Sequence, residues 1–121
     1  MWPFKPFKPH PNLRSEINNA IMESELAGGA YLSRLAVGRK LLVQTRNTLY
    51  SIERRADGLY ISGNAKFCPK PVKCKIPGSN FGGSMLKMDF VGRGLYMEFT
   101  TEDHPTVICT SQIQEITEVN L

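Results

Sequence analysis

Between residues 72 and 99, three short runs alternate apolar and polar side chains, and this alternation is the strongest constraint on how the chain folds. The runs cover residues 72–76, 86–90 and 95–99, with apolar residues at every second position. Successive side chains of a β-strand point to opposite faces, so each run predicts a strand with one face in a core. The stretch therefore predicts a β-rich fold.

The chain after Gly38 is typical of β-structure as a whole, because short apolar runs are separated by residues that favour tight turns. Asn47 and the pair Asp57-Gly58 tolerate the backbone of such turns and predict two hairpins. The predicted strands cover residues 41–45, 49–53, 59–61, 72–76, 84–91, 95–100 and 106–110. A parallel sheet would need crossover helices between strands, and the sequence predicts none.

We therefore expect a mainly β fold, a small antiparallel β-barrel or strongly bent sheet of about seven short strands. This architecture resembles SH3-like and oligonucleotide-binding barrels, although no shared motif supports the likeness. Residues 30–37 fit either a short helix or a strand. Ile113 and Ile116 are three positions apart, a spacing that predicts one helical turn before the acidic end.

One helix is expected over residues 13–27, ahead of the strands. Leu13, Ile17 and Ile21 are four positions apart and form an apolar stripe, and Asn12 is a suitable N-cap. The stripe predicts that the helix packs across an open end of the sheet. Residues 12–121 are therefore expected to form a single domain.

An extended arm is expected over residues 1–11, where prolines at positions 3, 6, 9 and 11 favour polyproline II. Its aromatic side chains, Trp2, Phe4 and Phe7, are candidates for binding a partner. The arm is expected to dock on its own domain, on a neighbouring subunit or on another protein, or to be a terminus without a partner.

The net charge of +4 is unevenly distributed along the chain. Residues 30–93 contain twelve Lys and Arg against three acids, whereas residues 94–121 contain five acids and no Lys or Arg. A basic centre of this kind is typical of surfaces that bind nucleic acid or another polyanion. The alternative is that the acidic strands lie beside the basic strands and neutralise them.

The glycine-rich segment 78–84 is the most distinctive candidate site. Its glycines allow successive amides to point one way, as in anion-binding nests, and Phe81 offers a ring for stacking. It lacks the Gly-Lys-Ser/Thr ending of a P-loop. The alternative is a wide connection with Phe81 in the core. The candidate residues for binding nucleic acid or another anion are Arg46, Lys73, Lys75, Phe81, Lys87 and Arg93.

Catalysis and metal binding have little support in the sequence. Three cysteines fit a reducing compartment, and Cys74 and Cys109 are predicted to point into the core. The spacing of Cys68 and Cys74 matches no zinc site, so no metal or cofactor is expected. His104 is the residue to test first if the protein is an enzyme, which we do not favour.

We expect a cytoplasmic protein, since no apolar run approaches the roughly 20 residues that span a bilayer and residues 1–11 do not resemble a signal peptide. The leading hypothesis is a non-enzymatic binding module whose basic face contacts single-stranded nucleic acid or another polyanion. The alternative is a protein-interaction or self-assembling module that uses the arm. A third hypothesis places a small-ligand site or an enzyme at segment 78–84.

Overall fold

The computed structural model describes residues 29–120, which form an antiparallel, mainly β fold. The elements are β1 (Gly29–Tyr31), the 3-10 helix η1 (Leu32–Arg34), β2 (Arg39–Thr45), β3 (Leu49–Arg55), β4 (Gly58–Ser62), β5 (Val72–Asn80), β6 (Leu86–Met88), β7 (Phe90–Gly92), β8 (Tyr96–Thr101) and β9 (His104–Asn120). Within 29–120 there is no α-helix, and no helix is long or apolar enough to cross a membrane. The helix predicted over 13–27 and the arm with Trp2, Phe4 and Phe7 lie outside the described residues.

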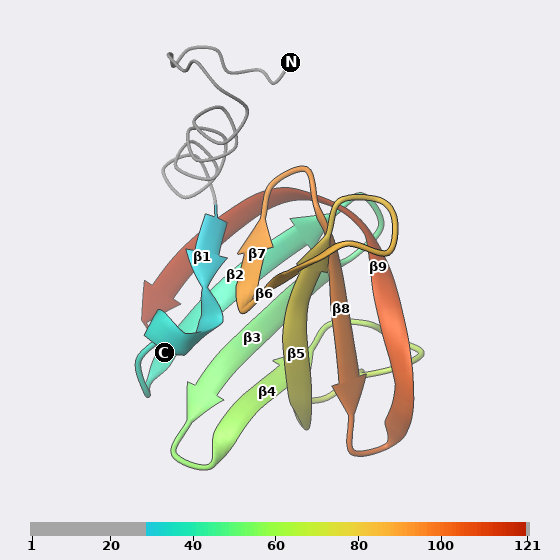
Figure 1. Cartoon of the computed structure of the whole chain (residues 1–121). Helices are drawn as coiled ribbons and strands as arrows, with labels where there is room; N and C mark the ends of the chain where they lie inside the picture. The colour runs from blue at the N-terminus through green and yellow to red at the C-terminus, as the bar shows by residue number, and fades with distance from the viewer. Residues whose placement is uncertain (1–28, 121) are drawn as a thin grey trace, which may run out of the picture.

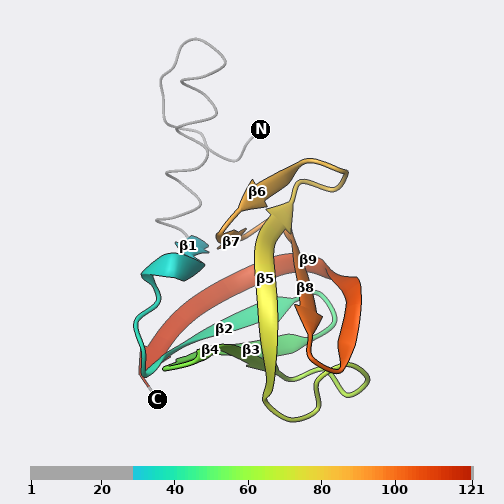
Figure 2. The same ribbon diagram turned by 60° about the horizontal axis from the view of Figure 1, so that its bottom comes forward.

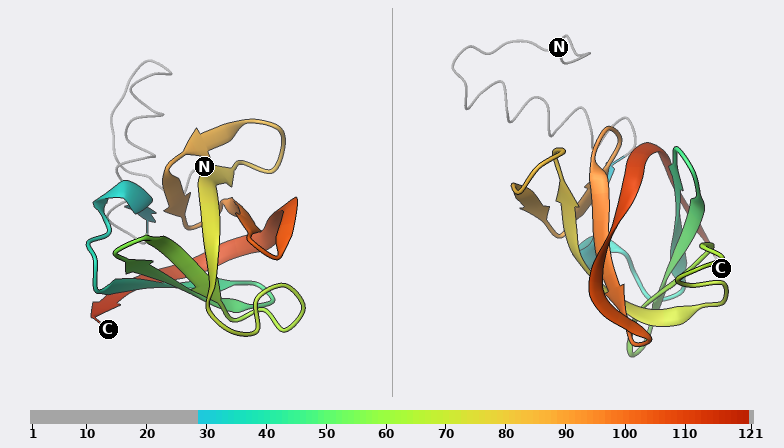
Figure 3. Two further views of the ribbon diagram at one scale, coloured as in Figure 1. Left: turned by 90° about the horizontal axis from the view of Figure 1, so that it is seen from below. Right: turned by 90° about the vertical axis from the view of Figure 1, so that its right-hand side faces the viewer.

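Seven strands form one sheet in the order β4-β3-β2-β9-β8-β5-β6 (Figure 1). Because β4 also pairs with β5, six of these strands make a near-closed ring, and β6 stands outside it. The β5–β6 hairpin extends away from the ring in Figure 2, and Figure 3 shows it on the opposite side of β8 and β9 from β2 and β3. A separate two-stranded sheet joins β1 to β7.

The core fills the inside of the ring with the apolar faces that the alternation predicts. Leu41 and Val43 of β2, Ile52 of β3, and Met97 and Phe99 of β8 are each at most 1% exposed. The predicted strands at 41–45, 49–53, 59–61 and 95–100 are therefore confirmed to within a few residues. Residues 30–37 contain both alternatives, since β1 ends at Tyr31 and η1 follows.

The single strand predicted over 84–91 is wrong, because the backbone breaks at Asp89. Asp89 has a φ of 61°, so β6 and β7 on either side leave in different directions and pair with β5 and β1. Aspartate tolerates this left-handed backbone because its short side chain forms local hydrogen bonds. Here the Asp89 carboxylate accepts hydrogen bonds from the backbone N–H and the hydroxyl of Ser33.

The helical turn predicted at Ile113 and Ile116 is also wrong, since both residues belong to β9. The register between β2 and β9 shifts between Gln44 and Thr45, which places one extra residue in β9. An extra residue in a β-bulge changes the side-chain alternation by one position. Two isoleucines three positions apart can then both contact the core, as these do.

Two turns are displaced from their predicted positions. The two-residue loop of the β3–β4 hairpin is Ala56-Asp57, one position earlier than predicted, because Arg55 pairs with Gly58. β5 continues to Asn80, so residues 78–80 of the predicted glycine-rich connection are strand residues. The connection between β5 and β6 is therefore the shorter loop 81–85.

Candidate functional site

The loop 81–85 begins from a firmly held strand end. Ser79 is fully buried, and its hydroxyl donates a 2.6 Å hydrogen bond to the carbonyl oxygen of Phe90. Asn80 is also buried, and its Oδ1 accepts a 2.8 Å hydrogen bond from the backbone N–H of Gly82. Phe81, between these anchors, is 55% exposed. The alternative in which Phe81 folds into the core is therefore wrong, and its ring is accessible from solvent.

A second aromatic side chain, Tyr96, lies beside the loop and was not among the predicted site residues. Tyr96 pairs with Asn80 across β5 and β8. A Cβ atom on Gly82 would lie 3.6 Å from the Tyr96 ring, so the loop packs along the ring. The sequence did hold a signal, because Tyr96 occupies an outward position of the alternating run 95–99. Phe81 and Tyr96 therefore place two aromatic side chains at this end of the sheet.

Arg46 and Arg93 are carried by two turns that meet the same part of β9. The backbone N–H of Arg46 donates a 2.9 Å hydrogen bond to the carbonyl of Gln112, whose side-chain amide donates to the carbonyl of Gly94 at 3.1 Å. The β2–β3 turn, the β7–β8 turn and the loop 81–85 all lie at one end of the molecule (Figure 1). The structure therefore brings Arg46 and Arg93 to the end that holds Phe81.

Lys73 and Lys75 lie elsewhere, on the outer face of the first half of β5. They line a groove of about 460 Å³ together with Cys74, Thr100, Thr101, Glu102 and Pro105. Lys73 Nζ is 3.6 Å from a carboxylate oxygen of Asp57, so part of its charge is balanced, whereas Lys75 is exposed. Thr101 is 6% exposed, and its hydroxyl has no hydrogen-bond partner within the described part of the chain.

Lys87 is held against aromatic rings on another side of the hairpin. Its ammonium lies 5.1 Å from the ring centre of Tyr31 and 5.2 Å from that of Phe90. Such cation–π contacts favour a structural role, in which Lys87 covers the junction between β1 and β7. The six predicted residues therefore fall into three groups, with Phe81, Arg46 and Arg93 at one end, Lys73 and Lys75 on lower β5, and Lys87 apart.

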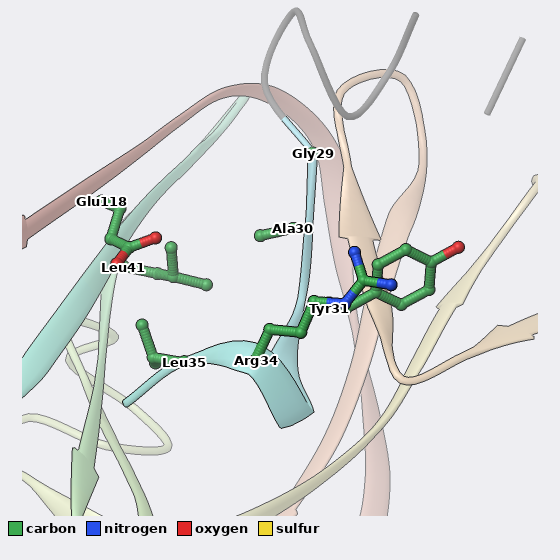
Figure 4. Close-up of a pocket in the computed structure, with 7 residues that line it drawn as sticks. All are labelled: Gly29, Ala30, Tyr31, Arg34, Leu35, Leu41 and Glu118. Atoms are coloured by element: carbon green, nitrogen blue, oxygen red, sulfur yellow. The ribbon is translucent and has the colours of Figure 1, made fainter. Parts of the chain in front are cut away.

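A smaller cavity of about 240 Å³ lies beside Gly29, where the described chain begins (Figure 4). Ala30, Leu35 and Leu41 give it an apolar floor, and the Arg34 guanidinium lies over the Tyr31 ring at its rim. Glu118 lines the same cavity and forms a 2.8 Å ion pair with Arg39, one place where the acidic last strand meets basic β2. Neither this cavity nor the groove on β5 is lined by the loop 81–85.

The adjacent arginines Arg54 and Arg55 do not form a phosphate-binding pair, because they point to opposite faces of β3. Arg54 donates to the carbonyl oxygens of Leu35 and Leu32 at 3.1 and 2.7 Å and thereby fixes η1. Arg55 binds the Glu53 carboxylate and lies 4.2 Å from the ring centre of Tyr60. Both guanidinium groups are thus committed to contacts within the fold.

The cysteines and His104 belong to no group that could hold a metal ion within the described residues. Within residues 29–120 no group of three or more His, Cys, Asp or Glu side chains is close enough to hold a metal ion. His104 packs edge-on against Phe67 at 4.8 Å between ring centres, and its Nδ1 lies 3.2 Å from the carbonyl oxygen of Thr106. Comparison with known protein families, curated proteins and solved structures gives no match.

Cys109, predicted to point inward, is exposed, because the inward positions of this part of β9 are held by its buried neighbours Ile108 and Thr110. Cys68 and Cys74 are buried; burial raises the pKa of the Cys68 thiol and raises the pKa of Cys74 to about 12. With that pKa, Cys74 remains almost entirely in the thiol form at neutral pH.

We expect one thiol of the folded protein to react rapidly with a disulfide reagent and all three to react after unfolding in urea. Cys109→Ser should abolish the fast phase, because the thiolate is the reactive form and the other two thiols are buried. The measurement is the number of thiols released against time, and Cys68→Ser is the matched control. A fast phase that persists in Cys109→Ser would show that another cysteine is accessible.

Proposed function

We propose that this domain is a non-enzymatic binding module for single-stranded nucleic acid, and that the loop 81–85 with the outer face of β5 and β8 is its contact surface. The observation that carries the proposal is Phe81, a large aromatic side chain that is 55% exposed on this loop. Small β modules hold single strands by stacking bases on such rings. Tyr96 beside the loop extends the stacking surface.

Few cations lie near this surface, and this determines the expected strength of binding. Arg46 and Arg93 lie at the Phe81 end, and Lys75 lies on the same outer face as Tyr96. Glu98 also lies on this face, where the Asn80 amide donates a 2.7 Å hydrogen bond to its carboxylate. Three phosphate contacts imply that log K falls with log salt with a slope of about −2. We therefore expect weak binding that is clearest at low salt.

The experiment is the anisotropy of a labelled single-stranded oligonucleotide of about ten nucleotides, titrated with the full-length chain at several salt concentrations. Phe81→Ala should weaken binding about tenfold, because base–aromatic stacking contributes about 1–3 kcal/mol per base. Lys75→Ala should reduce the salt slope by about 0.7. Lys40→Ala is the matched control. Lys40 lies on β2, where it pairs with Glu53 of β3, and β2 is on the opposite side of the ring of strands from β5.

Three results would reject the proposal. They are an absence of binding at low salt, affinity that does not change with salt, and equal losses in Lys75→Ala and Lys40→Ala. Equal affinity for another polyanion such as heparin would favour a general polyanion surface over a nucleic-acid site. The proposal also includes the finer architecture, a small barrel of SH3-like or oligonucleotide-binding type preceded by a helix over 13–27 and the arm over 1–11.

A second candidate function is a protein-interaction or self-assembling module. The observation that favours it is the exposure of Met85, just before β6, and of Met88, the last residue of β6, which are each 71% exposed. Large exposed apolar side chains that gather in one place are typical of docking surfaces. A partner that buries them would contact the same hairpin that presents Phe81.

A further inference from the structure

The β5–β6 hairpin gathers half of the exposed large hydrophobic side chains of the described chain. Phe81, Met85 and Met88, which we call the hairpin patch, are 55%, 71% and 71% exposed. The other three, Val37, Leu49 and Val107, are carried by separate elements. Because the hairpin extends away from the ring (Figure 2), the patch is not covered by another described strand.

The patch also borders a free strand edge. β6 is the last strand of the order β4-β3-β2-β9-β8-β5-β6, and among the described strands it pairs with β5 alone. Edge strands in native proteins are commonly covered by another segment, or protected by charge or by shortness. β6 is short and has one charged residue, Lys87, whose ammonium is drawn toward the rings of Tyr31 and Phe90. Met85 and Met88 are therefore the most exposed apolar side chains at this strand edge.

We propose that the chain's own N-terminal arm, residues 1–11, docks on the two methionines of the hairpin patch, Met85 and Met88, and leaves Phe81 uncovered. The arm contains three aromatic residues spaced by prolines, Trp2, Phe4 and Phe7, and its four prolines lack the backbone N–H that a regular strand requires. Methionine sulfur makes favourable contacts with aromatic rings, and its flexible side chain adapts to them. The aromatic rings of the arm and the methionine side chains of the patch can therefore form sulfur–aromatic contacts with each other.

The length of the chain before residue 29 allows the contact. β1 begins at Gly29 and pairs with β7, and the backbone N–H of Leu32 binds the carbonyl of Asp89, the residue that follows β6. The described chain therefore starts at Gly29, opposite Gly92, and meets the corner from which the hairpin leaves at Leu32. Eleven residues in polyproline II span about 34 Å, and a helix over residues 13–27, which join the arm to Gly29, would be about 22 Å long. Together these lengths exceed the roughly 30 Å diameter of a small domain. The arm can reach the patch of its own molecule.

The single tryptophan of the chain, Trp2, reports directly on this contact. In the full-length protein, we expect Trp2 emission to be blue-shifted and protected from acrylamide relative to the urea-unfolded chain. The double substitution Met85→Ser and Met88→Ser should return both values to those of the unfolded chain. Val107→Ser is the matched control, because Val107 is 54% exposed on β9, away from the hairpin, and should leave Trp2 unchanged.

A second measurement keeps the test independent of the stability of the double variant. Full-length Trp2→Ala should shift the methyl NMR signals of Met85 and Met88, which lose the ring current of Trp2, and leave that of the buried Met97 in place. Both variants retain Phe81, so their outcome does not depend on nucleic-acid binding. Each of three results would overturn the proposal: solvent-exposed Trp2 emission in the wild type, protection that survives the double substitution, and protection that is lost on dilution, which indicates docking between molecules.

Discussion

Replacing Gly78 with alanine should lower the free energy of unfolding by about 3 kcal/mol or more and separate the β5–β6 hairpin from the ring. Gly78 has a φ of 154°, and a Cβ atom at this position would overlap the backbone carbonyl oxygen of Lys87 on the paired strand. Backbone cannot move aside as a flexible side chain can. The clash therefore has to be relieved by breaking the pairing of Gly78 with Met88.

Urea unfolding followed by circular dichroism measures this loss, and Gly83→Ala is the matched control. A Cβ atom on Gly83 would have no neighbour within 4 Å, so the same substitution there should change stability by less than about 0.5 kcal/mol. Because Gly78 precedes Ser79 and Asn80, which anchor the loop 81–85, Gly78→Ala should also weaken oligonucleotide binding. Equal stability of the two variants would mean that the close approach of β5 and β6 is not present in solution.

The parts of the fold that could be predicted from the sequence are those determined by local alternation. Leu41, Val43 and Ile52 face the core as their spacing predicts, since all three lie in the regular register between β2 and β3. Prediction failed where one residue changes the pattern. The left-handed backbone of Asp89 splits one predicted strand into two, and the register shift in β9 makes Ile113 and Ile116 resemble a helical turn. Both depend on pairing partners distant in the sequence.

The candidate site was predictable in part for the same reason. Phe81 was identified because glycines on both sides indicate a connection, and the structure leaves its ring exposed. The order of the strands brings Arg46 and Arg93 to the end that holds Phe81. It leaves Lys73 and Lys75 on the other half of β5. The alternation of apolar and polar residues does not specify this order. The two rings beside the Lys87 ammonium are those of Tyr31 in β1, 56 positions before Lys87, and Phe90 in β7, three positions after it.

Phe99→Ala should be the most destabilising single truncation in the core, with a loss of about 3–5 kcal/mol. Phe99 is fully buried, and its ring packs edge-on against Tyr50 with 5.6 Å between ring centres. It joins β8 to β3 across the inside of the ring, so its removal leaves a cavity that strands held by their hydrogen-bond ladders cannot close. Since a domain of this size is stable by about 5–15 kcal/mol, the variant should be close to unfolding at 37 °C.

Phe81→Ala removes the same atoms from an exposed position and is the matched control for this prediction. It should change the free energy of unfolding by less than about 0.5 kcal/mol, because a side chain that is 55% exposed contributes little to the core. Thermal unfolding of the two variants should therefore separate them by tens of degrees at about 4–8 °C per kcal/mol. Paired with the oligonucleotide titration, the comparison separates the two phenylalanines by role. Phe99→Ala should destabilise the fold, whereas Phe81→Ala should keep the fold and weaken binding. Similar melting temperatures would mean that Phe81 is packed in solution, and the stacking surface proposed for it would have to be abandoned.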